Sequence, residues 1–417
     1  MFSTDRSGAE TWECVARSNP QAQILQAMKG MKTLRSGRNR RKWIYVLLLM
    51  GLLGLSGCGS PSSASVEMSS QTELVKTGSM ELQYAENFAV DYYEDGYKML
   101  TTLPDSKRYL LVPEGQPMPR GLDEDVSILQ EPLQNIYLVA SGVMDMFASL
   151  DAVDQIRFSG QKQENWYIQT AKDAMAAGDM IYAGKYSKPD YELLVSEGCD
   201  LAIENRMITH SPEVVEMLQS FDIPVMIEYS SYEKHPLGKV EWVKFFGALT
   251  GREAEAEEAF AEQTEILEEV ESGEKTGKTI AFFYVTSNGL IQVRQSTDYI
   301  PKLIELAGGR YIFEDLEDSG SGRSTLNMPV EDFYAGAKDA DILIYNSSID
   351  GGVTTVDELI GKCNILKDFK AVQEGQVYCT TNDMYQQSMA IGYLLQDMHT
   401  VLTNDDTAKL RYLFLLQ

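Results

Sequence analysis

The sequence predicts an α/β fold with two Rossmann-like lobes, a long backbone helix that joins them, and a ligand cleft between them. Three observations support this fold class. Short apolar segments alternate with helical ones from Asn135 to the C-terminus, an acidic helical region without proline divides this series, and the two halves share a sequence pattern. With 417 residues, of which 44% are hydrophobic, the chain can form two or three domains and bury a sizeable core.

The first lobe is assigned to residues 78–239. After the apolar strand predicted over residues 135–140, a Ser-Gly break leads into a helix over residues 143–150, which gives a strand-turn-helix unit. Residues 200–205 and 223–227 are short, apolar and preceded by helical segments, as buried parallel strands are. Within residues 78–131, which show no such pattern, residues 80–112 are expected to add an antiparallel hairpin to this lobe.

Residues 240–275 are predicted to form the helices that link the lobes. No proline occurs from Val240 to Ser272, and apolar residues from Trp242 to Leu249 repeat at helical spacing. Glu and Ala dominate residues 253–271, which favours a second, longer helix with an acidic exposed face. We therefore expect two consecutive helices here.

The second lobe is assigned to residues 276–417. Its strands are predicted over residues 278–285, 290–295, 341–346 and 376–380, and its helices over residues 299–307 and 386–402. Residues 200–205 and 341–346 both consist of Asp, three apolar residues, one variable residue and Asn. Each follows a helix with an early glutamate, Glu192 or Glu331. This shared context favours duplication of a lobe over a chance match.

The first 57 residues have the features of an export signal. Five basic residues from Arg35 to Lys42 precede an apolar run from Ile44 to Leu55, which is roughly half as long as the ~20 residues that span a bilayer. The run ends in Leu-Ser-Gly-Cys, which resembles a bacterial lipobox. We therefore expect cleavage that leaves Cys58 as a lipid-carrying N-terminus, with an uncleaved signal anchor as the alternative.

Residues 58–77 are expected to form a lipid-anchored flexible tether. Serine is frequent from Gly59 to Ser70 and Pro61 interrupts the stretch, so it cannot pack a core. The residues before Met31 resemble neither a signal nor a domain, so translation from Met28 or Met31 is a further hypothesis. The sequence thus predicts an extracytoplasmic body that contacts the membrane only through its lipid.

Charge and composition argue against several classes of protein. The 62 acidic and 36 basic residues give a formal net charge of -26, which repels nucleic acid. The five cysteines include no Cys-x-x-Cys pair, so neither a zinc knuckle nor a dense disulfide scaffold is indicated. We expect a monomer without a cofactor of its own.

Together these features resemble the solute-binding lipoproteins of ABC importers, in the class with a rigid helical backbone that serves iron-siderophore, haem and cobalamin uptake. Seven segments carry the resemblance, and their order is more specific than any one of them: residues 150–156, 189–195, 199–203, 223–225, 246–251 with Ala256, 304–309 and 370–378. The resemblance implies a protein without enzymatic activity that holds an iron-siderophore-type complex between its lobes and delivers it to permease subunits. Haem and cobalamin remain alternative ligands.

The resemblance also implies functional residues. In the family, one glutamate on each lobe pairs with permease arginines, and by motif these positions are Glu192 and Glu331. The alternative is that both are ordinary early-helix glutamates, which the helix dipole favours. Ligand contacts are expected from aromatic and basic residues in loops at strand ends. The candidates, each of which could instead be ordinary surface or core, are Trp166, Tyr167, Arg206, Tyr229, Tyr232, Arg294, Tyr299, Met384 and Tyr385.

Two competing classes have less support in the sequence. Residues 273–279 nearly form a phosphate-binding loop, but three residues separate the glycines where four are needed, and a strand follows where a helix is required. No Gly-x-Ser-x-Gly elbow of a cell-surface α/β hydrolase occurs. A free zinc or manganese binder requires clustered imidazoles, whereas His210, His235 and His399 lie in three separate segments.

Overall fold

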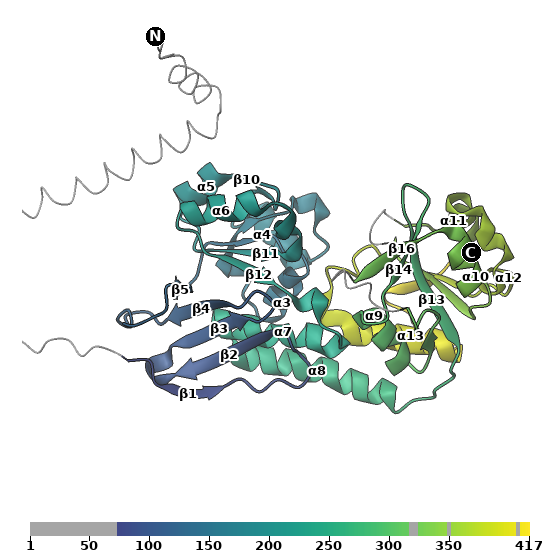
Figure 1. The fold of residues 1–417 in the computed structure, drawn as a ribbon, viewed down its shortest axis with the longest axis horizontal. Coiled ribbons are helices and arrows are strands. Elements are labelled where there is room, and N and C mark those ends of the chain that lie inside the picture. The colour runs from purple at the N-terminus through teal and green to yellow at the C-terminus, as the bar shows by residue number, and fades with distance from the viewer. Residues whose placement is uncertain (1–72, 317–323, 348–351, 406–408) are drawn as a thin grey trace, which may run out of the picture. The chain divides into compact units, whose positions relative to one another are not determined.

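The computed structural model describes residues 73–316, 324–347, 352–405 and 409–417 (Figure 1). The predicted export signal, Cys58 and all but the end of the predicted tether lie outside these residues. Among the described helices, none combines the length and the apolar character that a membrane span requires.

Residues 76–130 form a five-stranded sheet of their own. Its strands, in spatial order, are β1 (Lys76–Ser79), β2 (Phe88–Tyr93), β3 (Lys98–Thr102), β4 (Lys107–Val112) and β5 (Val126–Gln130). Neighbouring strands are antiparallel except β4 and β5, which are parallel. The antiparallel pairing expected for residues 80–112 is present, but these strands belong to a sheet separate from that of the first lobe. The apolar face of this separate sheet packs instead on the linking helices, with the Phe88 ring centroid 4.9 Å from that of Trp242.

The first lobe is built on a parallel sheet. Its strand order is β12 (Val225–Glu228), β11 (Leu201–Asn205), β6 (Ile136–Leu138), β7 (Ile156–Ser159) and β8 (Ile181–Tyr182). The connecting elements are α3 (Val143–Ser149), α4 (Gln169–Ala177), the hairpin of β9 (Gly184–Lys185) and β10 (Lys188–Pro189), α5 (Tyr191–Glu197) and α6 (Pro212–Ser220). Every residue of β6 and all but the last of β11 are buried. Burial on both faces explains why these strands are continuous apolar runs in the sequence.

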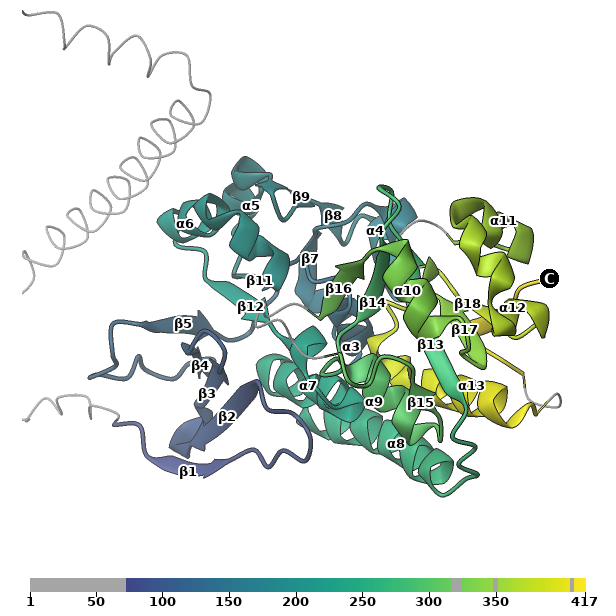
Figure 2. The same cartoon turned by 45° about the vertical axis from the view of Figure 1, so that its right-hand side comes forward.

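Two helices, α7 (Pro236–Thr250) and α8 (Glu253–Glu271), link the lobes and pack against each other (Figure 2). All residues of α7 except Thr250 are buried, so this helix has no exposed face. Only one stripe of α8 is buried, as its acidic composition predicts. A Cβ at Gly247 would lie 2.6 Å from the Cβ of Ala256, so glycine is what allows the two helices to approach. The expected pair of helices is present, and the first begins at Pro236 instead of Val240.

The second lobe contains a mixed sheet. Its strand order is β16 (Thr325–Met328), β14 (Ile291–Arg294), β13 (Thr279–Val285), β17 (Ile342–Tyr345), β18 (Val377–Thr380) and β19 (Leu413–Leu415), and β15 (Arg310–Tyr311) also pairs with β13. Its helices are α9 (Tyr299–Leu306), α10 (Val330–Ala337), α11 (Val356–Lys362), α12 (Lys370–Gln373) and α13 (Ile391–Thr403). Strands β15, β13, β17 and β18 are parallel, while β14, β16 and β19 run antiparallel to their neighbours.

Short 3₁₀ helices complete the described chain. They are η2 (Glu94–Gly96), η3 (Val153–Gln155), η4 (Gln163–Asn165), η5 (Arg206–His210), η6 (Ser230–Tyr232), η8 (Asn364–Asp368) and η9 (Ser388–Ala390). One apolar core includes side chains of the N-terminal sheet, α3, α7, α8, α9 and α13. The lobes keep separate sheets, so the predicted two-lobe α/β architecture is confirmed, with α7 at the centre of the core that both lobes share.

Candidate functional site

The two lobes meet at the first turn of α7, around Lys239. The helix begins at Pro236 after His235, whose Nδ1 accepts a hydrogen bond from the Leu237 backbone N–H at 3.2 Å. Lys239 is only 5% exposed, and its Nζ lies 4.8 Å from the ring centroid of Tyr299, the first residue of α9 in the second lobe. The start of the linking helix therefore places an ammonium group against the second lobe.

Three carboxyl groups, from both lobes, interact electrostatically with this lysine without pairing with it. Asp145 of α3 and Glu228 of β12 belong to the first lobe, and Asp298, the residue that caps α9, belongs to the second. Burial raises the pKa of all three, to about 6 for Asp145, and the charge of Lys239 opposes the shift in each case. We name Lys239, Asp145, Glu228 and Asp298 the junction cluster.

A set of hydrogen bonds joins the lobes beside the junction cluster. Gln386 of the second lobe accepts a hydrogen bond from the Tyr167 N–H at 2.8 Å through Oε1 and donates to the Asn165 carbonyl at 2.9 Å through Nε2. A third hydrogen bond joins the lobes where Asp145 of the first lobe accepts the Met389 N–H of the second at 2.7 Å. These three bonds, which we name the clasp, fix the lobes to each other at this point.

The loop of the clasp also carries two of the predicted ligand residues. Tyr385 is 38% exposed, and its hydroxyl accepts a hydrogen bond from Gln386 Nε2 at 3.0 Å. Met384 is buried in the main apolar core. A Cβ at Gly142, in the Ser-Gly break after β6, would lie 2.9 Å from Ser388 Oγ, so this glycine allows the second lobe to approach the first.

Three predicted ligand residues come together at the ends of two neighbouring strands of the first lobe. Arg206 directly follows β11, and Tyr229 and Tyr232 follow β12. The guanidinium carbon of Arg206 lies 4.6 Å from the ring centroid of Tyr232, and the rings of Tyr229 and Tyr232 are 6.4 Å apart. Tyr232 is 39% exposed, whereas Tyr229 is buried. Their proximity follows from the parallel pairing of β11 and β12, whose carboxyl ends meet at one edge of the sheet.

The predicted ligand residues of the second lobe are also neighbours. Arg294 ends β14, and its Nη1 lies 3.6 Å from Oδ2 of Asp298. Tyr299 directly follows Asp298, whose side chain accepts the Ile300 N–H at 3.0 Å and so begins α9. Arg294 and Tyr299 are thus connected to the junction cluster through Asp298.

Trp166 differs from the other candidates because its ring lies in the core of the first lobe. It is fully buried, and its indole N–H donates a hydrogen bond to Ser159 Oγ at 3.0 Å. The ring therefore presents no surface to a ligand, and the predicted contact has no support in the geometry. Tyr167, the next residue along the chain, is 43% exposed.

The two predicted docking glutamates occupy equivalent positions in the two lobes. Glu192 is the second residue of α5, which Asp190 caps by accepting the Leu193 N–H at 3.1 Å. Glu331 is the second residue of α10. Both are exposed, and within the described residues neither side chain forms an ion pair. Their carboxylates are therefore accessible, which the docking interpretation requires.

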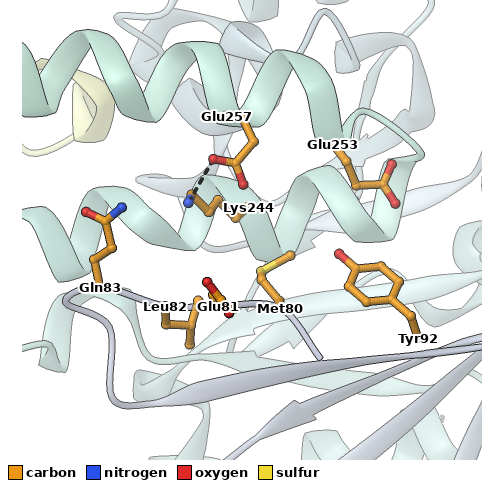
Figure 3. Close-up of a pocket in the computed structure, with 8 residues that line it drawn as sticks. All are labelled: Met80, Glu81, Leu82, Gln83, Tyr92, Lys244, Glu253 and Glu257. Atoms are coloured by element: carbon orange, nitrogen blue, oxygen red, sulfur yellow. Dashed lines mark ion pairs between the residues drawn. The ribbon is translucent and has the colours of Figure 1, made fainter. Parts of the chain in front are cut away.

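A hollow of about 390 Å³ lies apart from the junction, between residues 80–83 and helices α7 and α8 (Figure 3). It is lined by Met80, Glu81, Leu82, Gln83, Tyr92, Lys244, Glu253 and Glu257. Its cation is already paired, since Lys244 Nζ is 2.9 Å from a Glu257 carboxylate oxygen. None of the sequence-predicted ligand residues lines this hollow, so we place the candidate site at the junction.

Sequence reasoning missed the junction cluster and Gln386. A signal for Lys239 existed, because Lys239, Glu241 and Lys244 are the only charged residues in the apolar stretch that forms α7. Asp298 could have been recognised as a helix cap before the apolar residues of α9. For Gln386 the sequence offers no signal, because its role depends on backbone groups about 220 residues away in the chain.

Comparisons with known proteins agree with this two-lobe architecture. A family model described as periplasmic binding protein matches residues 138–384. An uncharacterized lipoprotein of Methanocaldococcus jannaschii is 24% identical over 394 residues, which cover 86% of this chain and 92% of that protein. Among solved structures, the ABC-type Fe3+-hydroxamate transport system of Saccharomonospora viridis is similar with a TM-score of 0.52 and 17% identity, covering 65% of this chain and 93% of its own. The periplasmic heme binding protein of Vibrio cholerae gives 0.51 and 15%, covering 64% and 98%.

Proposed function

The chain belongs to the periplasmic binding protein family, and from this premise we propose that it captures an iron-siderophore-type complex and delivers it to an ABC permease. The ligand binds at the junction of the lobes, in contact with residues from both. The protein acts by binding and release and catalyses no reaction.

The observation that carries this proposal is the group of exposed tyrosines around the junction. Tyr167, Tyr232 and Tyr385 are 43%, 39% and 38% exposed, and all lie in loops next to the clasp or at the strand ends of the first lobe. The faces of exposed aromatic rings suit the flat or rounded surface of an organic chelate. Tyr167 of the first lobe and Tyr385 of the second are both hydrogen-bonded to Gln386, and this pairing across the lobes supports a ligand held between them.

Arginine supplies the polar part of the proposed recognition. Arg206 stacks on Tyr232 at 4.6 Å, which orients its planar guanidinium group beside the exposed ring. A guanidinium group forms directed hydrogen bonds with anionic oxygens, such as the metal-coordinating oxygens of a ferric chelate. The Saccharomonospora viridis protein of similar fold is described as part of a Fe3+-hydroxamate transport system, which is consistent with this ligand class.

Delivery is proposed to depend on Glu192 and Glu331. One exposed carboxylate on each lobe provides two separated charged contacts, which orient the protein on basic groups of the permease and speed the encounter. The equivalent second position of both residues in their helices supports this role. Cys58 is proposed to hold the protein at the outer surface of the membrane through its lipid, and the lipoprotein designation of the archaeal relative is consistent with that.

Ligand binding can be tested by titrating the chain with ferric siderophores and following intrinsic fluorescence. We expect saturable binding of a ferric siderophore and ~10-fold weaker binding by Tyr232→Ala, since the loss of a good stacking contact costs about 1.4 kcal/mol. Tyr182→Ala is the matched control, because Tyr182 is 40% exposed but lies on β8, away from Arg206.

Other ligands give distinguishable outcomes in the same titration. Binding of haem or cobalamin without binding of ferric siderophores would keep the transport function but replace the ligand. Stoichiometric zinc or manganese in the purified protein, bound without an organic chelator, would contradict the proposed ligand class. Within the described residues, no three His, Cys, Asp or Glu side chains are grouped so that they could hold a metal ion.

A further inference from the structure

Lys239 is a nearly buried cation whose ammonium group has no hydrogen-bonding partner. It is 5% exposed, and within the described residues its Nζ forms neither a hydrogen bond nor an ion pair and contacts the face of the Tyr299 ring instead. Lys244, one turn later in the same helix, is similarly buried at 4% but has Glu257 at 2.9 Å. The two lysines are therefore almost equally buried, but only Lys244 has an ion-pair partner. Burial in α7 alone does not explain why Lys239 has none.

The carboxylates near Lys239 are engaged with other groups. Asp145 accepts the Met389 N–H at 2.7 Å, and Glu228 accepts the Ser230 N–H at 2.9 Å. Asp298 accepts the Ile300 N–H at 3.0 Å and faces Arg294. All three influence Lys239 only through the longer-range electrostatic field. Within the described residues, the donors of the Lys239 ammonium group thus remain without an acceptor.

Restricting the access of an ammonium group to water is costly unless its three N–H donors find acceptors. An oxygen of a bound ligand would supply such acceptors, and Lys239 lies on the linking helix with its Nζ against Tyr299 of the second lobe, where the lobes meet. We infer that Lys239 binds an anionic oxygen of the ligand and so selects anionic chelates over neutral ones. This inference rests on the proposed function and specifies its substrate class.

The inference separates ligands that the proposed function leaves together. A ferric tris-catecholate is a multiply charged anion, and haem carries two propionates, so each can present an anionic oxygen to Lys239. A ferric tris-hydroxamate without further acidic groups is neutral, and in cobalamin the positive charge of the cobalt-corrin centre balances the single phosphodiester anion, so neither is an anionic chelate. The binding protein should therefore prefer the first two ligands to the last two.

The test compares Lys239→Met with the wild type by titration calorimetry of the full chain in detergent. The probes are one ferric tris-catecholate, one neutral ferric tris-hydroxamate, haem and cobalamin. Lys239→Met should lower the affinity for whichever anionic ligand the wild type binds by roughly 30-fold or more, because a buried charge-assisted contact is lost. Lys239→Arg, which keeps the charge, should restore a large part of that affinity.

Lys234→Met is the matched control, because Lys234 precedes the same helix but is 72% exposed and pairs with Glu86. It should change the affinity for every probe by less than about 3-fold. Thermal unfolding of each variant, followed by circular dichroism, checks that Lys239→Met is folded at the titration temperature. An unfolded Lys239→Met is replaced by Lys239→Gln, which keeps a hydrogen-bond donor but no charge.

The outcomes distinguish the inference from the proposed function. Equal effects of Lys239→Met on anionic and neutral ligands, or no effect, would overturn the inference and leave the proposed function standing. Binding of the neutral hydroxamate or cobalamin in preference to both anions would overturn it as well. A wild type that binds haem but neither siderophore would replace the ligand class of the proposed function while still testing Lys239 on the propionates. If the wild type binds none of the four probes, both the inference and the proposed function are overturned.

Discussion

At the scale of single residues, the chain buries several carboxyl groups that differ in how they are satisfied. Glu241 is fully buried and accepts three backbone N–H groups, whereas Glu204 is fully buried and neither of its carboxyl oxygens has a hydrogen-bond partner. Asp145 lies between these cases, with one hydrogen bond from the opposite lobe. Burial costs all three carboxyl groups their hydration, but hydrogen bonds offset this cost to different extents. Glu241 should therefore stabilise the folded state, whereas Glu204 should destabilise it.

The first prediction concerns Asp145, whose pKa burial raises from 3.8 to about 6. The folded state holds this proton more tightly than the unfolded state, so the contribution to stability is full below pH ~4 and is lost as the pH rises through about 6. The pKa shift corresponds to a change of about 3 kcal/mol at most in the free energy of unfolding over this pH range. Asp145→Asn, whose carbonyl can still accept the Met389 N–H, should show a smaller loss of stability between pH 4.5 and pH 7 than the wild type does.

Urea unfolding at several pH values measures this difference. Only the difference between Asp145→Asn and the wild type is informative, because Glu228 and Asp298 also have raised pKa values and add their own pH dependence. Identical pH profiles of the two proteins would show that Asp145 ionises normally in the folded state.

The second prediction concerns Glu204 on β11, whose pKa burial raises far above its ordinary value. A neutral carboxyl group without partners loses its hydration and gains nothing in return. Glu204→Met, with a side chain of similar length and no polar oxygen, should raise the free energy of unfolding by about 1–2 kcal/mol. Glu204→Gln keeps a polar group at the same place and should bring no such gain, so equal stability of the two variants would contradict the prediction.

At the scale of elements, the central feature is the attachment of the N-terminal sheet to α7. The segment that leads from β1 to β2 is fixed to the helix by Glu241, which accepts the N–H groups of Gln83, Tyr84 and Ala85 at 2.8–2.9 Å. Glu233 holds the next residues in the same way, with hydrogen bonds from the Glu86 and Asn87 N–H groups. Two buried carboxylates thus replace the strand pairing that this segment lacks.

The third prediction tests this attachment. Glu241→Gln loses the negative charge and places an N–H₂ group against backbone donors, so the free energy of unfolding should fall by roughly 2–3 kcal/mol. Amide hydrogen exchange of residues 83–85 should become faster in the same variant. Glu255→Gln is the control, because Glu255 pairs with Arg252 at the start of α8 and the two side chains are 44% and 41% exposed, so its loss should cost less than about 1 kcal/mol.

Hydrogen exchange separates a local effect from a general one. If residues 83–85 keep their protection in Glu241→Gln while the whole protein loses stability, then the carboxylate supports the helix and does not hold the segment. Equal losses in the Glu241 and Glu255 variants would also contradict the proposed attachment.

At the scale of the whole molecule, transport requires that the ligand site and the docking surfaces act together. The clasp and the shared core around α7 fix the lobes to each other. Glu192 and Glu331 each lie on one lobe, so a fixed arrangement of the lobes also sets the separation of the two docking charges. We therefore expect docking to depend on both glutamates at once.

The fourth prediction is that Glu192→Lys together with Glu331→Lys abolishes uptake while the ligand affinity stays unchanged. Two reversed charges repel the basic groups of the permease, and both residues lie in helices apart from the junction cluster. Uptake of a radiolabelled ferric siderophore into cells that carry the cognate permease measures the first effect, and titration of the purified variant measures the second.

The matched control for this prediction has the same change of net charge on the linking helix. Glu258 and Glu265 are exposed residues of α8, and their double replacement by lysine should leave uptake unchanged. Normal uptake by the Glu192 and Glu331 double variant would mean that these residues only begin their helices.

The sequence by itself determined the order of the elements and the two-lobe architecture. Both faces of parallel strands such as β6 and β11 are buried, so their sequences are uninterrupted apolar runs. The exposed face of α8 is recognisable in the sequence because it is acidic. Such patterns are local, and they can be recognised without knowing which segments meet. The grouping of Arg206, Tyr229 and Tyr232 was predictable for the same reason, since parallel strands bring their ends to one edge.

Only the tertiary structure decided which side chains face the junction. Trp166 and Tyr167 are adjacent in the sequence and equally aromatic, yet one ring is buried in the first lobe and the other is exposed. The separate N-terminal sheet and the contact of Lys239 with Tyr299 likewise depend on segments that are distant in the chain. Residue type records how buried a position is, but the partner of a buried group is set by the packing of whole elements, and no local pattern encodes it.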